Sequence, residues 1–116
     1  MRIRIIVLMV MFLGLAGCGT MKFEMGTEFD STMLEQSLQT GISTQSNVKA
    51  LLGEPYGQGR ALMPFHDSPR TVWTYYFERG ELDLGGKNSH DHRRYLFVFF
   101  LGDRYDGYMW FDSQMQ

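Results

Sequence analysis

The chain has 116 residues, a formal net charge of −2 and one cysteine. This length suits one small domain, and a single cysteine excludes a disulfide within a monomer, so stability has to come from packing. The mildly acidic charge, with no basic cluster, argues against nucleic acid as a partner and against electrostatic docking to anionic lipid.

Residues 1–17 have the layout of a secretory signal peptide. Arg2 and Arg4 give a positive start, residues 5–15 are apolar apart from one glycine, and Ala16-Gly17 supplies the small residues that precede a cleavage site. The apolar run is shorter than the roughly 20 residues that a membrane-spanning helix needs. We therefore expect this segment to direct export and to be removed.

Cys18 follows this segment directly, and Leu15-Ala16-Gly17-Cys18 resembles the bacterial lipobox. The resemblance implies that a diacylglycerol is attached to the thiol and that cleavage leaves Cys18 as the first residue. The alternative is a plain signal peptide with an incidental cysteine, which would carry an unpaired thiol into an oxidising compartment. Once residues 1–17 are removed, nine basic residues face thirteen acidic ones, a formal charge of −4. Acyl chains rather than charge would then hold the protein at a membrane.

Residues 18–30 are expected to form the lipidated N-terminus and a tether, because the stretch after Cys18 shows no usable hydrophobic period. Twelve extended residues reach at most about 40 Å. Residues 31–116 are expected to form the folded domain.

The domain is predicted to begin with two short helices. The first is expected at residues 31–38, with Asp30 or Ser31 as its cap, and Gly41 ends the segment.

The second helix follows the hydroxyls of Ser43-Thr44. Val48, Leu51 and Leu52 form its apolar stripe. Gly53 tolerates the left-handed conformation at a helix end, and Pro55 prevents the helix from continuing. This helix needs a packing partner because a helix of two or three turns is marginal alone.

Three strands are predicted after the helices, at residues 71–78, 94–101 and 104–111, because aromatic and β-branched residues are dense there. Gly102-Asp103 is a tight turn between the last two strands, which implies an antiparallel hairpin. Gly107 is a candidate position for a β-bulge.

The segments between these elements are expected to be loops. Residues 56–70 form a long loop that leaves room for a short strand at 60–63, and residues 79–92 form a second loop. The complete pattern predicts an α+β fold in which two short helices pack on a three-stranded antiparallel sheet in two layers.

Parts of this pattern resemble the SmpA/OmlA (BamE-like) family of outer-membrane lipoproteins. The matching stretches are residues 44–55, Trp73-Thr74-Tyr75 and residues 96–100, together with the lipobox. The resemblance implies two helices on a three-stranded sheet, an anchor in the inner leaflet of the outer membrane and a non-enzymatic accessory role. Gly19 after the cysteine fits this address. The motif positions are Thr44, Val48, Leu52, Gly53, Pro55, Trp73 and Tyr75.

The second face of the predicted sheet is the candidate interface. Trp73, Tyr75 and Phe77 share one side of their strand and are expected to pack under the helices, whereas Phe97 and Phe99 lie on the other side of the next strand. Either a loop covers this second face or it is an aromatic patch that binds a partner. Tyr108 and Trp110 are expected to extend the patch.

Catalytic and metal chemistry find little support in the sequence. The cluster of Asp83, His90, Asp91 and His92 could bind a metal, but histidines in a polar loop are more often solvated, so we expect no metal site. We find no serine in a nucleophile-elbow context and no glycine-rich phosphate loop. We therefore expect a protein that is not an enzyme and has no cofactor.

Two functions agree with these expectations. The first is an outer-membrane lipoprotein on the periplasmic face that acts as a small scaffold or accessory in envelope or outer-membrane protein assembly, with another envelope protein as partner. The alternative is a periplasmic binding or inhibitor module for a hydrolase or a cell-wall ligand.

The anchor assignment is tested by labelling cells with radioactive palmitate. The native chain is expected to incorporate label, and the variant Cys18→Ala is expected to incorporate none. Label that persists in Cys18→Ala would show that this cysteine does not carry the lipid.

Overall fold

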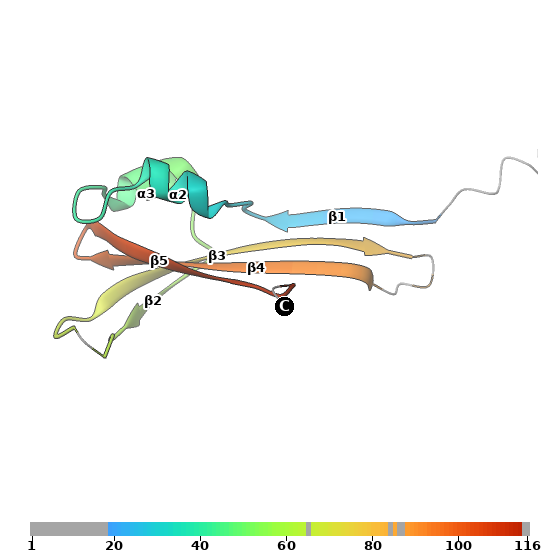
Figure 1. Ribbon diagram of the computed structural model, residues 1–116. Helices are drawn as coiled ribbons and strands as arrows, with labels where there is room; N and C mark the ends of the chain where they lie inside the picture. Colours follow the sequence, from blue (N-terminus) through green and yellow to red (C-terminus); the bar gives the residue numbers. More distant parts are fainter. Residues whose placement is uncertain (1–18, 65, 84, 86–87, 115–116) are drawn as a thin grey trace, which may run out of the picture.

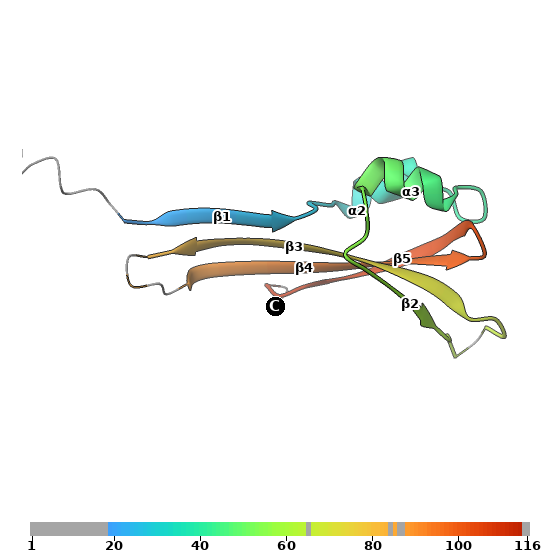
Figure 2. The ribbon, with the colours of Figure 1, turned by 180° about the vertical axis from the view of Figure 1, so that it is seen from behind.

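A computed structural model describes residues 19–64, 66–83, 85 and 88–114. Within these residues both helices cover the same face of an antiparallel sheet of five strands (Figures 1 and 2). The predicted α+β class and the two helices are therefore confirmed, but the prediction of three strands is wrong. In chain order the elements are β1 (Met21–Gly26), α2 (Ser31–Ser37), α3 (Gln45–Leu52), β2 (Gly57–Ala61), β3 (Arg70–Leu82), β4 (Asn88–Leu101) and β5 (Arg104–Asp112).

The two longest strands of the sheet, β3 and β4, pair with each other and are antiparallel. The strand order is β1-β3-β4-β5, and β2 also pairs with β3. Since β4 occupies one edge of β3, β1 and β2 share the other edge. β2 pairs with residues 70–74 of β3 and β1 with residues 77–82. The helices lie over the β2 half, and β1, β3 and β4 extend beyond them (Figure 1).

The helix ends follow the expected chemistry. The side chain of Asp30 accepts a hydrogen bond from the Thr32 amide at the start of α2. Thr44 and Asn47 form a capping box at the start of α3, which satisfies two backbone donors at once. Gly53 closes α3 with a φ of 80°, a conformation that glycine adopts at little cost.

The core lies between the helices and the sheet. The Tyr75 hydroxyl donates a 2.9 Å hydrogen bond to the Gly53 carbonyl and ties the end of α3 to β3. The loop between the helices is bound to β5, because the Tyr105 amide donates to the Ser43 carbonyl at 2.8 Å. Twelve buried side chains form the core: Phe29, Leu34, Leu38, Val48, Leu52, Trp73, Tyr75, Phe77, Leu96, Val98, Phe100 and Tyr105. The expectation that Trp73, Tyr75 and Phe77 pack under the helices is confirmed.

Strand β1 occupies part of the segment that we expected to be a tether. Residues 21–25 alternate apolar and charged side chains, which is the period of a half-exposed strand. The pairing is supported on the helix side of the sheet by the ion pair of Arg79 with Glu24 at 2.9 Å and by Lys22 near Glu81 at 3.8 Å. This alternation covers only five residues, so it is a weak signal in sequence alone.

The two expected loops also contain strands. Residues 79–82 belong to β3 and residues 88–92 to β4, so the loop predicted at 79–92 is mostly paired backbone. Cross-strand charge pairs, such as Arg93 with Glu78 at 3.3 Å, compensate for low strand propensity. In the first loop, β2 begins three residues before the expected 60–63 segment, because an edge strand tolerates the glycines Gly57 and Gly59.

The predicted signal peptide, residues 1–17, and the predicted lipidation site, Cys18, lie outside the described residues. In the part of the chain that the structure describes, neither helix has the length and hydropathy required to cross a bilayer.

The junction between β1 and β3 depends on Gly26, whose φ is +86°. A Cβ at this position would lie 1.9 Å from the Tyr76 carbonyl oxygen. We expect Gly26→Ala to release β1 and to accelerate its amide hydrogen exchange by about tenfold or more, equivalent to about 1.4 kcal/mol of local opening free energy. The amides of β3 and β4 should stay protected where they pair with each other.

Gly41→Ala is the matched control, because Gly41 has a φ of +77° but nothing lies within 4 Å of the position that a Cβ would take there. This variant should carry the same backbone strain without releasing β1. Unchanged exchange of β1 in Gly26→Ala would contradict the close approach.

Candidate functional site: the open sheet face

The sheet face opposite the helices carries a continuous set of apolar side chains, which we call the open face. Strand alternation and register place three rows side by side across β3, β4 and β5. Adjacent rows are two residues apart along a strand, so the three rows span about 13 Å. The rows are Val72, Phe99 and Gly107; Thr74, Phe97 and Met109; and Tyr76, Tyr95 and Phe111.

The outer part of the open face is exposed although it is aromatic. Tyr95, Met109 and Phe111 are 39%, 42% and 53% exposed. The rings contact each other across strands: Tyr76 and Tyr95 have centroids 5.1 Å apart, and Phe97 and Phe111 meet edge to face at 6.0 Å. Apolar side chains that gather on a surface and stay exposed are typical of an interaction site.

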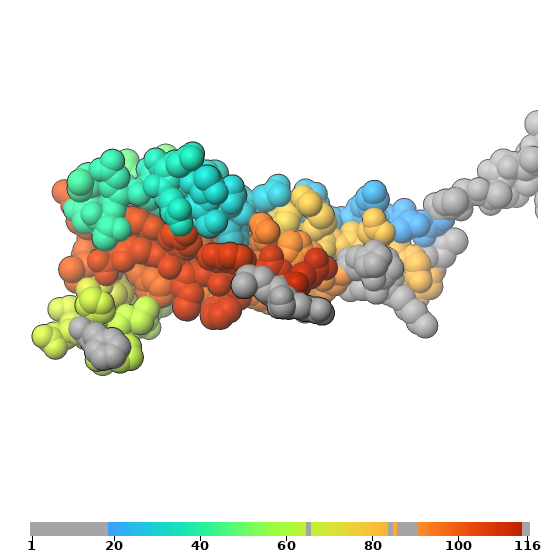
Figure 3. All heavy atoms as spheres, viewed as in Figure 1, coloured from blue at the N-terminus to red at the C-terminus, as the bar shows by residue number. Residues whose placement is uncertain are grey.

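The row of Val72, Phe99 and Gly107 forms one end of the open face, which we call the inner end. The connection between β2 and β3 covers this end. Phe99 is only 8% exposed, and Met63, Pro64 and His66 of the connection line a small cavity together with it. This connection projects from the sheet on the side away from the helices (Figure 3). The second face of the sheet is therefore partly covered and partly exposed. The connection covers Phe99, and the two neighbouring rows stay open.

A groove of about 550 Å³ lies between the projecting connection and the open rows. Its floor includes Phe97 and Met109, and one wall is β2. Gly57 and Gly59 add no side chain to this wall, and there is open space at both of their Cβ positions. Two glycines thus keep the groove open where larger residues would fill it.

Charged side chains bound the open face at both ends. At the inner end, the buried guanidinium of Arg70 binds Asp106 at 2.5 Å and the Ser68 carbonyl at 2.7 Å. At the other end, Arg93 binds Glu78 at 3.3 Å and Asp91 at 2.6 Å.

Tyr76 lies next to the charged group of Glu78, Asp91 and Arg93, and its pKa is raised. Burial and a hydrogen bond to the Glu78 carboxylate raise the pKa of Tyr76 to about 12. The same hydrogen bond is the largest cause of the lowered pKa of Glu78. Both groups therefore keep their ordinary charge states at neutral pH.

Tyr108 and Trp110 do not lie on the open face, so the prediction that they extend the aromatic patch is wrong. The reason is a β-bulge: Phe100 pairs with Tyr105, but Phe99 pairs with Gly107, which leaves Asp106 as an extra residue. Since side chains alternate with a period of two, one extra residue exchanges the faces of everything that follows.

The displaced residues support the core instead. Tyr108 and Trp110 pack against the core on the helix side of the sheet. The Tyr108 hydroxyl donates a 2.6 Å hydrogen bond to Glu35 of α2, and this bond is the main cause that raises the Tyr108 pKa to about 12. Met109 and Phe111 take their places on the open face. The candidate glycine bulge at Gly107 was the one sequence signal that could have identified them.

The positions shared with the family motif have structural contacts. Thr44 caps α3, Val48 and Leu52 fill the core, and Pro55 follows Gly53 at the exit of the helix. The Lys49 ammonium lies 5.6 Å from the centroid of the Trp73 ring. These contacts secure α3 on β3 and leave the open face untouched.

The candidate metal ligands Asp91 and His92 lie on opposite faces of β4, because neighbouring side chains of a strand alternate between the two faces. His92 Nε2 lies 2.7 Å from Asp112 Oδ1 on the helix side of the sheet. Asp91 binds Arg93 on the opposite side. The side chain of His90 lies outside the described residues. Among the described residues we find no group of three histidine, cysteine, aspartate or glutamate side chains that could hold a metal ion.

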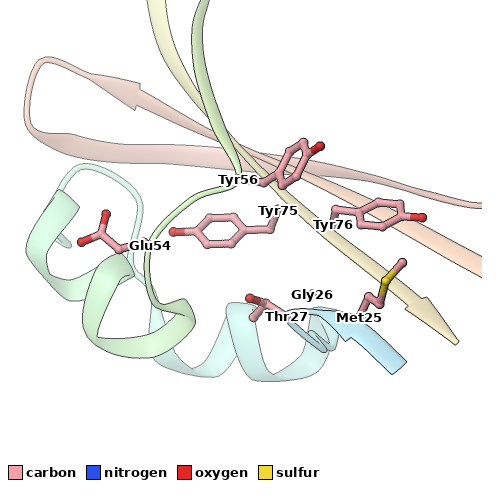
Figure 4. A pocket seen from close by; sticks show the side chains of 7 residues that line it. All are labelled: Met25, Gly26, Thr27, Glu54, Tyr56, Tyr75 and Tyr76. Atoms are coloured by element: carbon pink, nitrogen blue, oxygen red, sulfur yellow. The ribbon is translucent and has the colours of Figure 1, made fainter. Parts of the chain in front are cut away.

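A smaller cleft of about 350 Å³ lies at the edge of β3 opposite β4, between the end of β1 and the start of β2. The hydroxyl of Tyr75 points towards Glu54, and those of Tyr56 and Tyr76 point away from it (Figure 4). Burial, with a smaller effect of Glu54, raises the pKa of Tyr75 to about 12. Because the pKa values of Tyr75 and Tyr76 are both raised to about 12, both hydroxyls stay protonated at neutral pH.

A scan against protein-family models, a search of curated proteins and a search of solved structures each returned no match for this chain. The resemblance to the SmpA/OmlA family therefore stays a prediction from sequence.

The assignment of β5 side chains to the two faces predicts unequal stability effects. Trp110→Ala should lower the free energy of unfolding by about 2–4 kcal/mol, because it removes core packing. Phe111→Ala should cost about 1 kcal/mol or less, because this ring is mostly exposed and loses one edge-to-face contact. Urea denaturation of both variants measures the difference, and an equal or larger cost for Phe111→Ala would contradict the bulge register.

Proposed function

We propose that this protein is a lipid-anchored, non-catalytic protein of the bacterial envelope that binds another envelope protein through the open face. The anchor part of the proposal rests on the lipobox at Cys18. The binding part rests on one observation, which is that Tyr95, Met109 and Phe111 remain exposed beside a groove although apolar side chains of this size are normally buried.

The composition of the open face suits a protein partner. Tyrosine, phenylalanine and methionine are enriched in the centres of protein interfaces, and charged residues are depleted there and gather at the rim. The open face has the same arrangement, with Phe97, Phe111 and Met109 between the charged groups of Arg70 and Arg93.

An accessory role is preferred to catalysis for a physical reason. Among the described residues, strongly shifted pKa values occur at Tyr75, Tyr76, Tyr108 and Asp112. Each of these groups has a hydrogen-bond partner within the fold, so a structural role explains the shift. Asp112, for example, overcomes a burial cost through bonds from Gln114, His92 and Arg94, and its pKa falls to about 2. Such a carboxylate is a permanent ion-pair partner rather than an acid or base near neutral pH.

The second candidate function is a binding or inhibitor module for a hydrolase or a cell-wall ligand. The projecting connection between β2 and β3 favours it, because Leu62 is 70% exposed on a protrusion of the kind that can enter a cleft. Outer-membrane location and an accessory or scaffold role in envelope or outer-membrane protein assembly belong to the first proposal.

The variant Phe111→Asp tests the open face in cells that make the full-length precursor. We expect it to fold with an unchanged far-ultraviolet circular dichroism spectrum and to lose at least about tenfold of the yield of crosslinked partner, since a buried unpaired carboxylate costs more than 1.4 kcal/mol. Ile42→Asp is the matched control, because Ile42 is 64% exposed and lies in the loop between the helices.

Retention of the partner by Phe111→Asp, with its loss from Ile42→Asp, would overturn the assignment to the open face. Loss of the partner only when Leu62 is replaced by aspartate would favour the second candidate function.

A further inference from the structure

The position of β1 fixes the anchor relative to the sheet. β1 begins at Met21, and only Gly19 and Thr20 separate this residue from Cys18. Three residue steps span at most about 11 Å. A lipid on Cys18 would therefore be held within about 11 Å of the first residue of the strand, in place of the 40 Å tether expected from sequence.

The register of β1 determines which end of the sheet this is. Met21 pairs with Leu82, and Gly26 pairs with Phe77. The anchored end of β1 is therefore the end at which β3 finishes, far from the helices (Figure 2). Six residue pairs and the ion pairs of Arg79 with Glu24 and Glu28 resist separation of β1 from β3.

We infer that the sheet stands on the membrane, with the end at which β1 begins at Met21 and β3 finishes at Leu82 directed at the lipid surface and the helices remote from it. This inference rests on the lipid anchor of the proposed function. Met21 is 64% exposed at that end and can contact the lipid interface.

An upright sheet agrees with the distribution of charge better than a sheet lying on its open face. Asp91, Arg93 and Glu78 lie on the open face between the anchored end and the aromatic rows. A sheet lying flat would bring the Arg93 guanidinium and its two carboxylate partners to the bilayer together with the aromatic rows, and desolvating these charges would cost free energy.

The upright arrangement places the open face at a defined height. Along β3, Tyr76 is six residues and Val72 ten residues from Leu82, which corresponds to about 20 Å and about 33 Å at the rise of a strand. The aromatic rows would thus face sideways, clear of the lipid headgroups, where they can meet a neighbouring envelope protein.

The inference is tested with nitroxide labels on the lipidated full chain in vesicles of phosphatidylcholine that contain a nickel-chelating lipid. Because lipidation consumes the thiol of Cys18, the variants Glu81→Cys, Leu101→Cys and Met109→Cys each carry one reactive cysteine. They report on the anchored end, the remote end and the open face. Bound Ni²⁺ accelerates the relaxation of a nearby nitroxide, and this effect falls steeply with distance.

We expect strong relaxation enhancement at position 81 and several-fold weaker enhancement at positions 101 and 109. Adding Gly26→Ala should reduce the difference between positions 81 and 101, because release of β1 turns it into a flexible tether. Equal enhancement at positions 81, 101 and 109 in the native background would overturn the upright sheet and leave the anchor intact.

Failure of the anchor itself has a different result. If none of the labelled proteins floats with the vesicles, the lipid attachment of the proposed function is wrong and the inference falls with it. Flotation that persists at high salt supports an acyl anchor, since salt screens the attraction between exposed charges but does not weaken the burial of acyl chains.

Discussion

The face on which each aromatic side chain of β5 after Tyr105 lies depends on one extra residue. At Asp106 the register of β5 against β4 shifts by one position, and Gly107 adopts a φ of 121° that favours glycine. Asp106 is held by the buried guanidinium of Arg70, so the bulge is also an ion-pair site. Without the extra residue, Tyr108 and Trp110 would lie on the open face and Met109 and Phe111 would be directed at the core.

This constraint couples stability to the proposed binding surface. The hydroxyl of Tyr108 and the ring of Trp110 secure the helices only because the bulge turns them to that side. The same turn exposes Phe111 and Met109 next to the groove beside β2. The long pair of β3 and β4 then carries both features, and β1 extends it in the direction of the proposed anchor.

Local signals in the sequence were sufficient for the helices. Capping by Thr44, the stripe of Val48 and Leu52 and termination at Gly53 depend on residues within one turn of each other, and each is found in the structure. The grouping of core residues on β3 and β4 was predictable for a similar reason, since side chains two residues apart on an unbroken strand share a face, as Trp73 does with Tyr75 and Leu96 with Val98.

The remaining features depend on partners that are distant in the chain. β1 pairs with β3 over six residues, with Arg79 and Glu81 opposite its charged side chains, and no residue near Met21 in the sequence indicates these partners. β2 contains two glycines and forms because β3 offers a free edge. The candidate site is predictable in part: side-chain alternation places Phe97 and Phe99 on one face of β4, whereas Met109 and Phe111 join that face only because the bulge before Gly107 shifts the register of β5.

The central claim is that the open face, as set by the bulge, contacts a partner. It is tested most directly by placing a photoreactive amino acid in turn at positions 108, 109, 110 and 111 of the full-length protein in living cells and identifying the adducts by mass spectrometry. The account predicts that positions 109 and 111 form adducts with one protein and that positions 108 and 110 form none. Adducts at positions 108 and 110, or equal yields at all four positions, would contradict it.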